Sequence, residues 1–139
     1  MKTRITELFG TKYPIIMGAM YWIASPKLVA AICNAGGLGL YPVSGDTPEQ
    51  ARKAIREIKS LTDRPFGVNQ MLASPSAKEN IEMILDEKVP VIEYGLGRPW
   101  FIDKVHAYGG KVIAKLSIVK HAVKAEQLGV DAVNVVGYE

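Results

Sequence analysis

Apolar residues recur along the chain in two alternating patterns, short continuous runs and longer stripes at helical spacing. Each short run fits a strand buried on both faces of a parallel sheet. These runs span residues 14–18, 38–43, 65–71, 89–94, 111–116 and 131–136. Between them, apolar residues recur every three or four positions, as in the stripe Ala51, Ala54, Ile55, Ile58 and Leu61. This spacing predicts amphipathic helices between the strands, and a short amphipathic turn of helix is expected at residues 3–9.

Capping residues and prolines mark the starts of these five helices. Ser25-Pro26 and Thr47-Pro48 each place an N-cap residue before a proline at the first helical position. Gln50 completes a capping box with Thr47, and Ser76 to Glu79 has the pattern of a second box. The last two helices are expected to open at Pro99 and to be capped by Ser117.

The regular alternation of strand and helix predicts parallel strands joined by right-handed crossovers. No hairpin signal such as Asn-Gly joins two runs. A doubly wound open sheet and a (β/α)8 TIM barrel both fit this order. The first run leads into Gly-Ala-Met-Tyr-Trp at residues 18–22 rather than the Gly-x-Gly-x-x-Gly of a dinucleotide fold, which favours the barrel. Such a barrel takes about 250 residues, so residues 1–139 are expected to form its N-terminal part, with six strands and five helices.

Composition narrows the classes of function. The chain is 48% hydrophobic and 22% charged, as expected of a packed globular protein. Its net charge of +3 comes from scattered lysines and arginines, so nucleic acid is not expected as a partner. There is no apolar run of about 18 residues and no apolar signal core at the N-terminus, hence no membrane association is expected. The single cysteine, Cys33, is expected to be a buried core residue, and a cytoplasmic location follows.

Four segments together resemble one enzyme family. They read Pro-Ile-Ile-Met-Gly-Ala-Met at 14–20, Ala-Gly-Gly-Leu-Gly at 35–39, Pro-Phe-Gly-Val-Asn at 65–69 and Gly-Val-Asp-Ala-Val at 129–133. In this order and spacing they are similar to the nitronate monooxygenase family, formerly called 2-nitropropane dioxygenases. Its members are FMN-dependent (β/α)8 enzymes, and FMN-dependent enoyl-acyl carrier protein reductases belong to the same sequence family. The resemblance therefore implies FMN as the cofactor and no metal.

The resemblance also implies roles for residues at the carboxyl ends of the strands, where barrels bind their ligands. The backbone of Gly18, Ala19 and Met20 would lie along the flavin edge. Asn69 would hydrogen-bond FMN, and the cation of Lys115 would stabilise the anionic reduced flavin. From the residues alone, Asn69 could instead be a turn residue and Lys115 a surface lysine at the barrel rim.

Three more residues are candidates for the substrate side of the flavin. These are Tyr21, Trp22 and Gln70. Tyr21 and Trp22 fit equally well as packing residues of a loop over the barrel. Tyr41-Pro42 stands where many relatives carry a glycine-rich strand exit, and it would make that part of the rim bulkier and stiffer.

The catalytic residue is expected outside this chain. The family carries a catalytic histidine in a Glu-x-Gly-Gly-His loop after the sixth strand, which places it beyond Glu139. The loops after strands seven and eight, which hold the FMN phosphate, would follow. His106 and His121 lie in predicted helices away from the catalytic face, so neither is expected to act as the base.

Three functions remain open. The first is oxidation of alkyl nitronates by oxygen to a carbonyl compound and nitrite. The second is reduction of an enoyl thioester by NAD(P)H through FMN. The third is a catalytically incomplete unit that only folds or pairs with a second copy to cover its open sheet edges.

Overall fold

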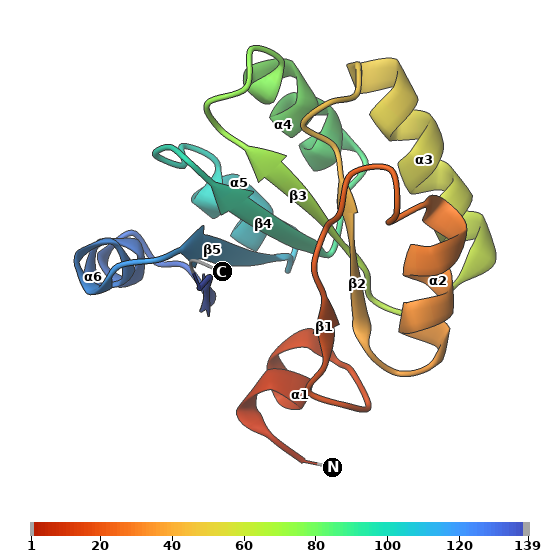
Figure 1. Cartoon of the computed structure of the whole chain (residues 1–139), viewed down its shortest axis with the longest axis horizontal. Coiled ribbons are helices and arrows are strands. Elements are labelled where there is room, and N and C mark those ends of the chain that lie inside the picture. The colour runs from red at the N-terminus through yellow and green to blue at the C-terminus, as the bar shows by residue number, and fades with distance from the viewer. Residues whose placement is uncertain (1, 138–139) are drawn as a thin grey trace.

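The computed structural model describes residues 2–137 and contains one parallel sheet, with the helices that connect its strands on one side (Figure 1). The six strands lie in chain order, each paired with the next. They are β1 (Ile16–Met17), β2 (Leu38–Pro42), β3 (Gly67–Met71), β4 (Val91–Gly95), β5 (Lys111–Leu116) and β6 (Ala132–Val135). The sheet curls as part of a (β/α)8 barrel, which confirms the predicted fold class.

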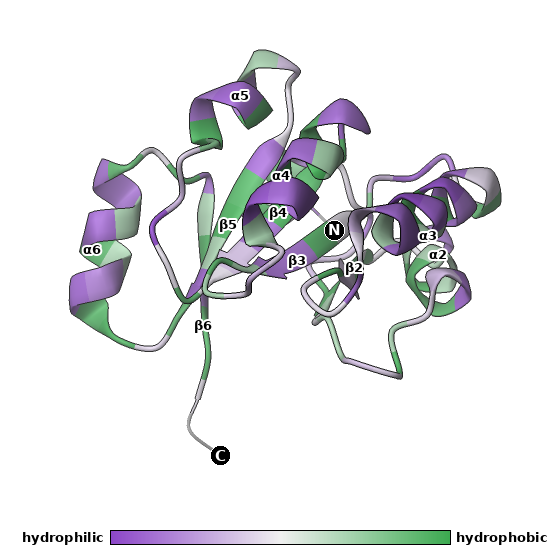
Figure 2. Cartoon of the chain, turned by 90° about the horizontal axis from the view of Figure 1, so that it is seen from above, coloured by the Kyte–Doolittle hydropathy of each residue, from purple (hydrophilic) through white to green (hydrophobic). Residues whose placement is uncertain are grey.

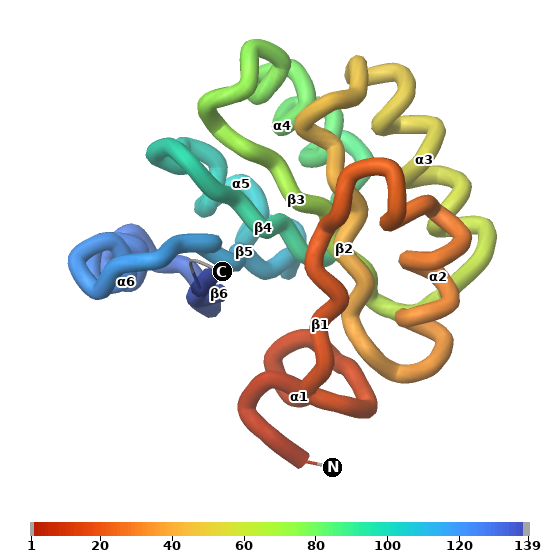
Figure 3. The backbone as a smooth tube through the Cα atoms, viewed as in Figure 1, coloured from red at the N-terminus to blue at the C-terminus, as the bar shows by residue number. Residues whose placement is uncertain are grey.

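Five helices connect consecutive strands, and a sixth precedes β1. The connecting helices are α2 (Pro26–Asn34), α3 (Pro48–Leu61), α4 (Ala77–Asp86), α5 (Ile102–Ala107) and α6 (Val119–Gln127). The tube in Figure 3 follows this alternation and shows α1 (Arg4–Phe9) apart from the others, below β1. Both the amino-terminal turn of helix and the five crossover helices were predicted from the hydrophobic pattern.

Two apolar layers lie on the two faces of the sheet. The concave, interior layer contains Leu38, Leu40, Val91 and Ile113, with Phe9 of α1 packed against them. The outer layer lies between the strands and helices α2 to α6, and includes Val68, Ile92 and Val112 of the strands with Ile55 and Ile84 of the helices. Apolar colour marks much of strand β5, and much of helix α3 is hydrophilic (Figure 2). Cys33 is buried in the outer layer, as expected, and burial raises the pKa of its thiol.

Several predicted boundaries were wrong. Strand β1 covers only Ile16–Met17, and Ile15, expected in the core, is 63% exposed because it lies on the outer edge of the sheet. Helix α5 begins at Ile102 rather than at Pro99, since residues 96–101 form a loop in which Leu96 has a positive φ of 52°. Helix α6 is preceded by Ile118 rather than Ser117 at the N-cap.

The capping prediction failed at Ser76 and held at Thr47. Ser76 makes no capping hydrogen bond to the backbone of α4, because its hydroxyl contacts the side chains of Ser74 and Asn80. At Thr47 both halves of the capping box are present. Its hydroxyl accepts from the Gln50 backbone N–H at 3.3 Å, and the side-chain Oε1 of Gln50 accepts from the Thr47 N–H at 2.9 Å.

Thr47→Ala should therefore lower the free energy of unfolding by about 1 kcal/mol. The substitution removes the hydroxyl that accepts from the Gln50 backbone N–H, and the capping box at the start of α3 is broken. Urea titration at neutral pH measures this loss. Ser60→Ala is the matched control, since Ser60 lies exposed near the end of the same helix and its hydroxyl bonds only the Glu57 carbonyl. An equal effect of the two substitutions would contradict the capping explanation.

Candidate functional site

Polar side chains meet on the interior face of the sheet, near the carboxyl ends of the strands. Alternate residues of a strand face the same side, and the registers align Asn69 with Glu93, and Lys115 with Asn134. These positions continue the interior rows that begin with Gly67, Val91, Ile113 and Ala132. The apolar interior layer thus ends in a polar layer, which is where parallel barrels place their ligands.

Glu93 is the centre of this polar layer. Its side chain is fully buried, and its two carboxylate oxygens accept from the amide Nδ2 of Asn69 at 2.6 Å and of Asn134 at 2.7 Å. Within residues 2–137, no lysine or arginine forms an ion pair with it. The charge-assisted hydrogen bonds from the two amides therefore stabilise the buried carboxylate in place of water.

The Glu93 carboxylate also fixes how both asparagines are oriented. An ionised carboxylate can only accept hydrogen bonds, so each asparagine must turn its NH2 group toward Glu93. Each amide oxygen and the second amide N–H then remain for other partners. Asn69 and Asn134 thus present two preoriented donor–acceptor pairs, which suits a ligand with adjacent carbonyl and N–H groups.

Lys115 lies beside this cluster on β5. It is half-buried, and no ion pair or side-chain hydrogen bond is found for it within the described part of the chain. Gly95 on the neighbouring strand leaves space there, since a Cβ on it would lie 3.9 Å from the Cβ of Lys115. Lys115 therefore offers a positive charge at the mouth of the interior face that no carboxylate neutralises.

The segment after β1 brings small residues to the same end of the sheet. A Cβ at Gly18 would meet nothing within 4 Å, so the space beside this backbone is open. Ala19 packs on the interior layer, and Met20 is 40% exposed. This open space beside Gly18 is what the close approach of a flat ligand requires.

Tyr21 and Trp22 follow in the loop between β1 and α2. The Tyr21 ring packs over Gly45, where an added Cβ would come within 2.7 Å of it. Trp22 is fully exposed and has a positive φ of 66°, an uncommon backbone conformation for a bulky residue. In this conformation the ring of Tyr21 packs on the neighbouring loop, and Trp22 projects into solvent.

Gln70 does not lie on the substrate side, contrary to the prediction. Its side chain is fully buried on the helix-facing side of β3. There its amide donates to the Met71 carbonyl at 2.8 Å and accepts from Asn80 of α4 at 3.2 Å. The reason is the two-residue repeat of a strand: with Asn69 facing the interior, Gln70 must face the helices.

Tyr41 likewise faces the helices rather than the barrel rim. It packs against the outer layer, and its hydroxyl donates to Asp46 at 2.8 Å. Burial and this carboxylate raise the pKa of the Tyr41 hydroxyl. The bulk of Tyr41 is therefore directed outward, whereas Pro42 is in register with Asn69 and lies on the interior face, as expected of a stiff rim residue.

The two histidines occupy different surroundings. His106 of α5 pairs with Asp131 at 2.8 Å, on the side of the sheet away from the polar layer. The backbone N–H of Val112, His106 and Lys111 together lower the pKa of Asp131 against the effect of its burial. His121 of α6 lines a pocket between the sheet and α6 that also includes Lys115.

Two of the central residues, Glu93 and Asn134, were not predicted from the sequence. A signal was available: each is a polar residue inside an apolar strand, in Val-Ile-Glu-Tyr and Ala-Val-Asn-Val. If β3 and β4 are paired in parallel with Asn69 opposite Glu93, the two residues must face the same side, which places Glu93 on the interior face. Within residues 2–137, no helix has the length and apolarity to cross a membrane, and no group of three His, Cys, Asp or Glu side chains could hold a metal ion.

Comparison with known proteins agrees with this architecture. The family model described as nitronate monooxygenase matches residues 2–82. A (3aS,4S,5R,7aS)-5-hydroxy-7a-methyl-1-oxo-octahydro-1H-indene-4-carboxyl-CoA dehydrogenase of Rhodococcus jostii (strain RHA1) is 39% identical over 140 residues, covering 100% of this chain and 40% of that protein. A nitronate monooxygenase of Paraburkholderia phytofirmans is 43% identical over 116 residues, covering 84% of this chain and 29% of that protein.

Among solved structures, a mutant of FabK from Thermotoga maritima superposes with a TM-score of 0.96 at 41% sequence identity. The match covers 100% of this chain and 47% of the FabK chain. The chain thus spans less than half the length of the relatives it matches from end to end. The family model matches more than half of the residues, and the chain belongs to the nitronate monooxygenase family.

Proposed function

We propose that this chain forms the FMN-binding part of a flavin-dependent oxidoreductase. The observation that carries the proposal is the buried Glu93 carboxylate holding Asn69 and Asn134 on the interior face, beside the unpaired Lys115. Residues 1–139 would then be the N-terminal part of one barrel domain.

The residues present fit FMN. The flavin ring system carries alternating carbonyl and N–H groups on one edge, and an amide oriented by Glu93 offers the complementary acceptor and donor. Asn69 and Asn134 would hold that edge. The open space beside Gly18 would admit the flat ring against the backbone of residues 18–20. Lys115 would place its positive charge near the site.

Bound FMN supplies two-electron oxidation and reduction. The chain's own residues position it and set its electrostatic surroundings. The positive charge of Lys115 would stabilise negative charge that develops in the site, because Lys115 forms no ion pair within the described residues. The apolar layer of Leu40, Val91 and Ile113 beneath the polar layer excludes water from the floor of the site.

Two substrate classes are supported by different relatives. Oxidation of alkyl nitronates is supported by the matched family model and the Paraburkholderia relative. Chemistry on a thioester is supported by the Rhodococcus CoA dehydrogenase, and by FabK, whose activity is enoyl-acyl carrier protein reduction; both match along the whole chain. Anaerobic mixing of the FMN-loaded protein with propionate 3-nitronate and with NADH separates them. Loss of the flavin absorbance with the nitronate but not with NADH supports nitronate oxidation. Loss of the flavin absorbance with NADH but not with the nitronate supports chemistry on a thioester.

FMN binding itself is tested by titrating the protein into FMN and following flavin fluorescence. We expect Lys115→Ala to weaken binding about tenfold, a loss of about 1.4 kcal/mol, because one favourable charge interaction is removed. Lys78→Ala is the matched control, since Lys78 is exposed on α4 on the other side of the sheet. Because the phosphate-holding loops are expected beyond Glu139, the test uses a protein that contains the complete barrel; its failure to bind FMN would refute the proposed function and favour the alternative of a unit that only folds or pairs.

A further inference from the structure

A second site lies at the carboxyl ends of β4 and β5, between the loop after β4 and helix α6. It is a pocket of about 470 Å³, within the range of small-molecule sites. Its walls come from residues 96–99 of the loop and residues 115–117 at the end of β5, together with His121 and Lys124 of α6. None of the site residues predicted from the sequence, Lys115 excepted, lines it.

Basic residues make up much of the polar lining of this pocket. Arg98, Lys115, His121 and Lys124 line it, and no aspartate or glutamate does. Within residues 2–137, no ion pair or side-chain hydrogen bond is found for any of the four, whereas Arg52, Arg56, Lys59 and Lys111 elsewhere are paired with carboxylates. The unpaired positive charges of Arg98, Lys115 and Lys124 at one pocket attract an anion with several charges.

The floor of the pocket is apolar. Tyr94, Ala114, Leu116, Ala125 and Leu128 line it between the sheet and α6. A ligand that fits both parts carries phosphate groups joined to an apolar or neutral arm. Small inorganic anions would satisfy the cations and leave this apolar surface uncovered.

We propose that this pocket binds the phosphate-bearing end of coenzyme A in an acyl-CoA substrate. The inference rests on the proposed function, because it names the substrate class of the same enzyme. Coenzyme A carries a pyrophosphate and a separate ribose phosphate, so its charge matches several cations. The phosphopantetheine of a carrier protein has one phosphodiester, which matches several cations less well.

The position of the pocket fits such a substrate. Lys115 lines the pocket and also stands beside the Glu93 cluster on the interior face. The pocket floor faces the helices, so a thioester arm would have to pass over the end of β5 at Lys115 to run toward the mouth of the proposed flavin site. Binding energy from the phosphates, far from the reacting carbon, would hold the acyl group in place for reaction.

The test is the affinity of the FMN-loaded protein for coenzyme A, measured by isothermal titration calorimetry at low and moderate salt. We expect Arg98→Ala with Lys124→Ala to weaken binding at least tenfold, and salt to weaken the unmodified protein more than this variant. The matched control is Lys104→Ala with Lys120→Ala. It removes the same charge from exposed positions on α5 and α6 that do not line the pocket.

Two further probes identify the chemistry. Pantetheine lacks the phosphates, and 4′-phosphopantetheine keeps only one. We expect both to bind more weakly than coenzyme A. The proposal is overturned if either binds as tightly, if the two double variants lose equal affinity, or if the unmodified protein does not bind coenzyme A at millimolar concentration.

Flavin fluorescence separates this inference from the proposed function. Both double variants should bind FMN as the unmodified protein does, because neither removes a residue of the interior site. If the protein binds FMN but not coenzyme A, the pocket assignment alone is overturned. If the protein binds coenzyme A but not FMN, the proposed function is overturned and the pocket assignment is retained.

Discussion

Replacing Glu93 with glutamine should destabilise the fold by about 1–3 kcal/mol and weaken FMN binding at least tenfold. The carboxylate now accepts one hydrogen bond on each oxygen, from Asn69 at 2.6 Å and from Asn134 at 2.7 Å. Glutamine replaces one of these oxygens with an NH2 group. That NH2 would face the NH2 of an asparagine, so one asparagine must turn or lose its partner.

A turned asparagine changes what the site offers to a ligand. With its oxygen toward residue 93, Asn69 or Asn134 would present NH2 where it presents an amide oxygen in the unmodified protein. The pattern that fits one edge of the flavin would be broken at that point. Stability and cofactor affinity should therefore fall together, although the glutamine side chain has nearly the same size.

Urea unfolding of the apoprotein and flavin fluorescence titration measure the two effects separately. Glu82→Gln is the matched control, because Glu82 is exposed on α4 and makes no side-chain contact within the described residues. We expect it to change stability by less than about 0.5 kcal/mol and to leave FMN binding unchanged. A Glu93→Gln protein as stable as the unmodified one would contradict the account of Glu93 as the centre of the polar layer.

The fold could be predicted because two signals agreed along most of the chain. Apolar runs of strand length alternated with helical stripes, and residues such as Thr47 and Ser25 marked where helices begin. Boundaries failed where tertiary contacts compete with local signals. The Ser76 hydroxyl contacts Asn80 instead of the helix backbone, and Pro99 lies in a loop shaped by the positive φ of Leu96.

The site was harder to predict, because its geometry depends on strand phase. Asn69 and Gln70 are neighbours in sequence, and both were candidates, yet consecutive strand residues face opposite sides of the sheet. The structure places Asn69 toward the interior and Gln70 toward α4. Glu93 and Asn134 come from strands 24 and 65 residues after Asn69, so only the parallel pairing of the strands brings them together.

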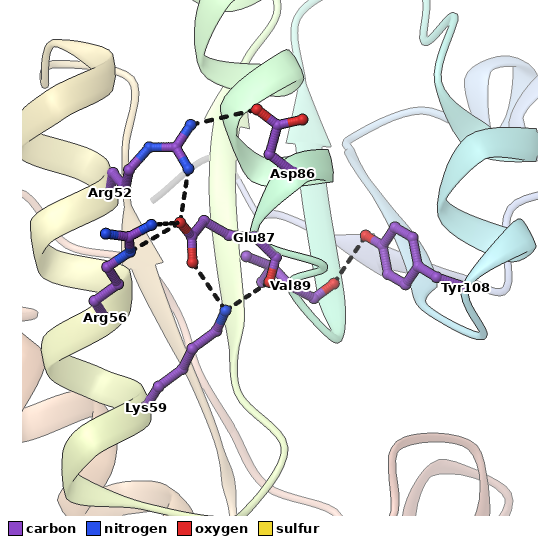
Figure 4. A network of polar contacts seen from close by, with 7 residues as sticks. All are labelled: Arg52, Arg56, Lys59, Asp86, Glu87, Val89 and Tyr108. Carbon is purple, nitrogen blue, oxygen red and sulfur yellow. Dashed lines mark hydrogen bonds and ion pairs between the residues drawn. The ribbon is translucent and has the colours of Figure 1, made fainter.

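A different carboxylate, Glu87, should show the clearest dependence of stability on pH. It follows α4, and its side chain, only 8% exposed, meets three cations of α3 (Figure 4). Its carboxylate lies 2.7 Å from Arg52, 2.9 Å from Arg56 and 3.0 Å from Lys59. Burial alone would raise the pKa of Glu87, but hydrogen bonds from these cations outweigh it and lower the pKa to about 2.

Glu87→Gln should therefore lower the free energy of unfolding by about 1–3 kcal/mol at pH 7, since charge-assisted hydrogen bonds to three side chains become neutral ones. The lower part of this range is expected because Arg56 is 64% exposed and its contact is screened by solvent. The folded pKa lies below the ordinary value for glutamate, so the contribution is fully present above about pH 4.5. It is lost as the pH falls toward 2, where the folded protein takes up the same proton.

Urea unfolding at pH 7, 4 and 2.5 follows this difference between the unmodified protein and the variant. We expect the difference to be largest at pH 7 and to shrink steadily toward pH 2.5. Asp86→Asn is the matched control: Asp86 is 70% exposed and contacts only Arg52, at 3.3 Å, so its loss should cost less than about 0.5 kcal/mol. A Glu87→Gln effect that is the same size at pH 2.5 as at pH 7 would show that packing, rather than the charge of Glu87, joins α3 to the end of α4.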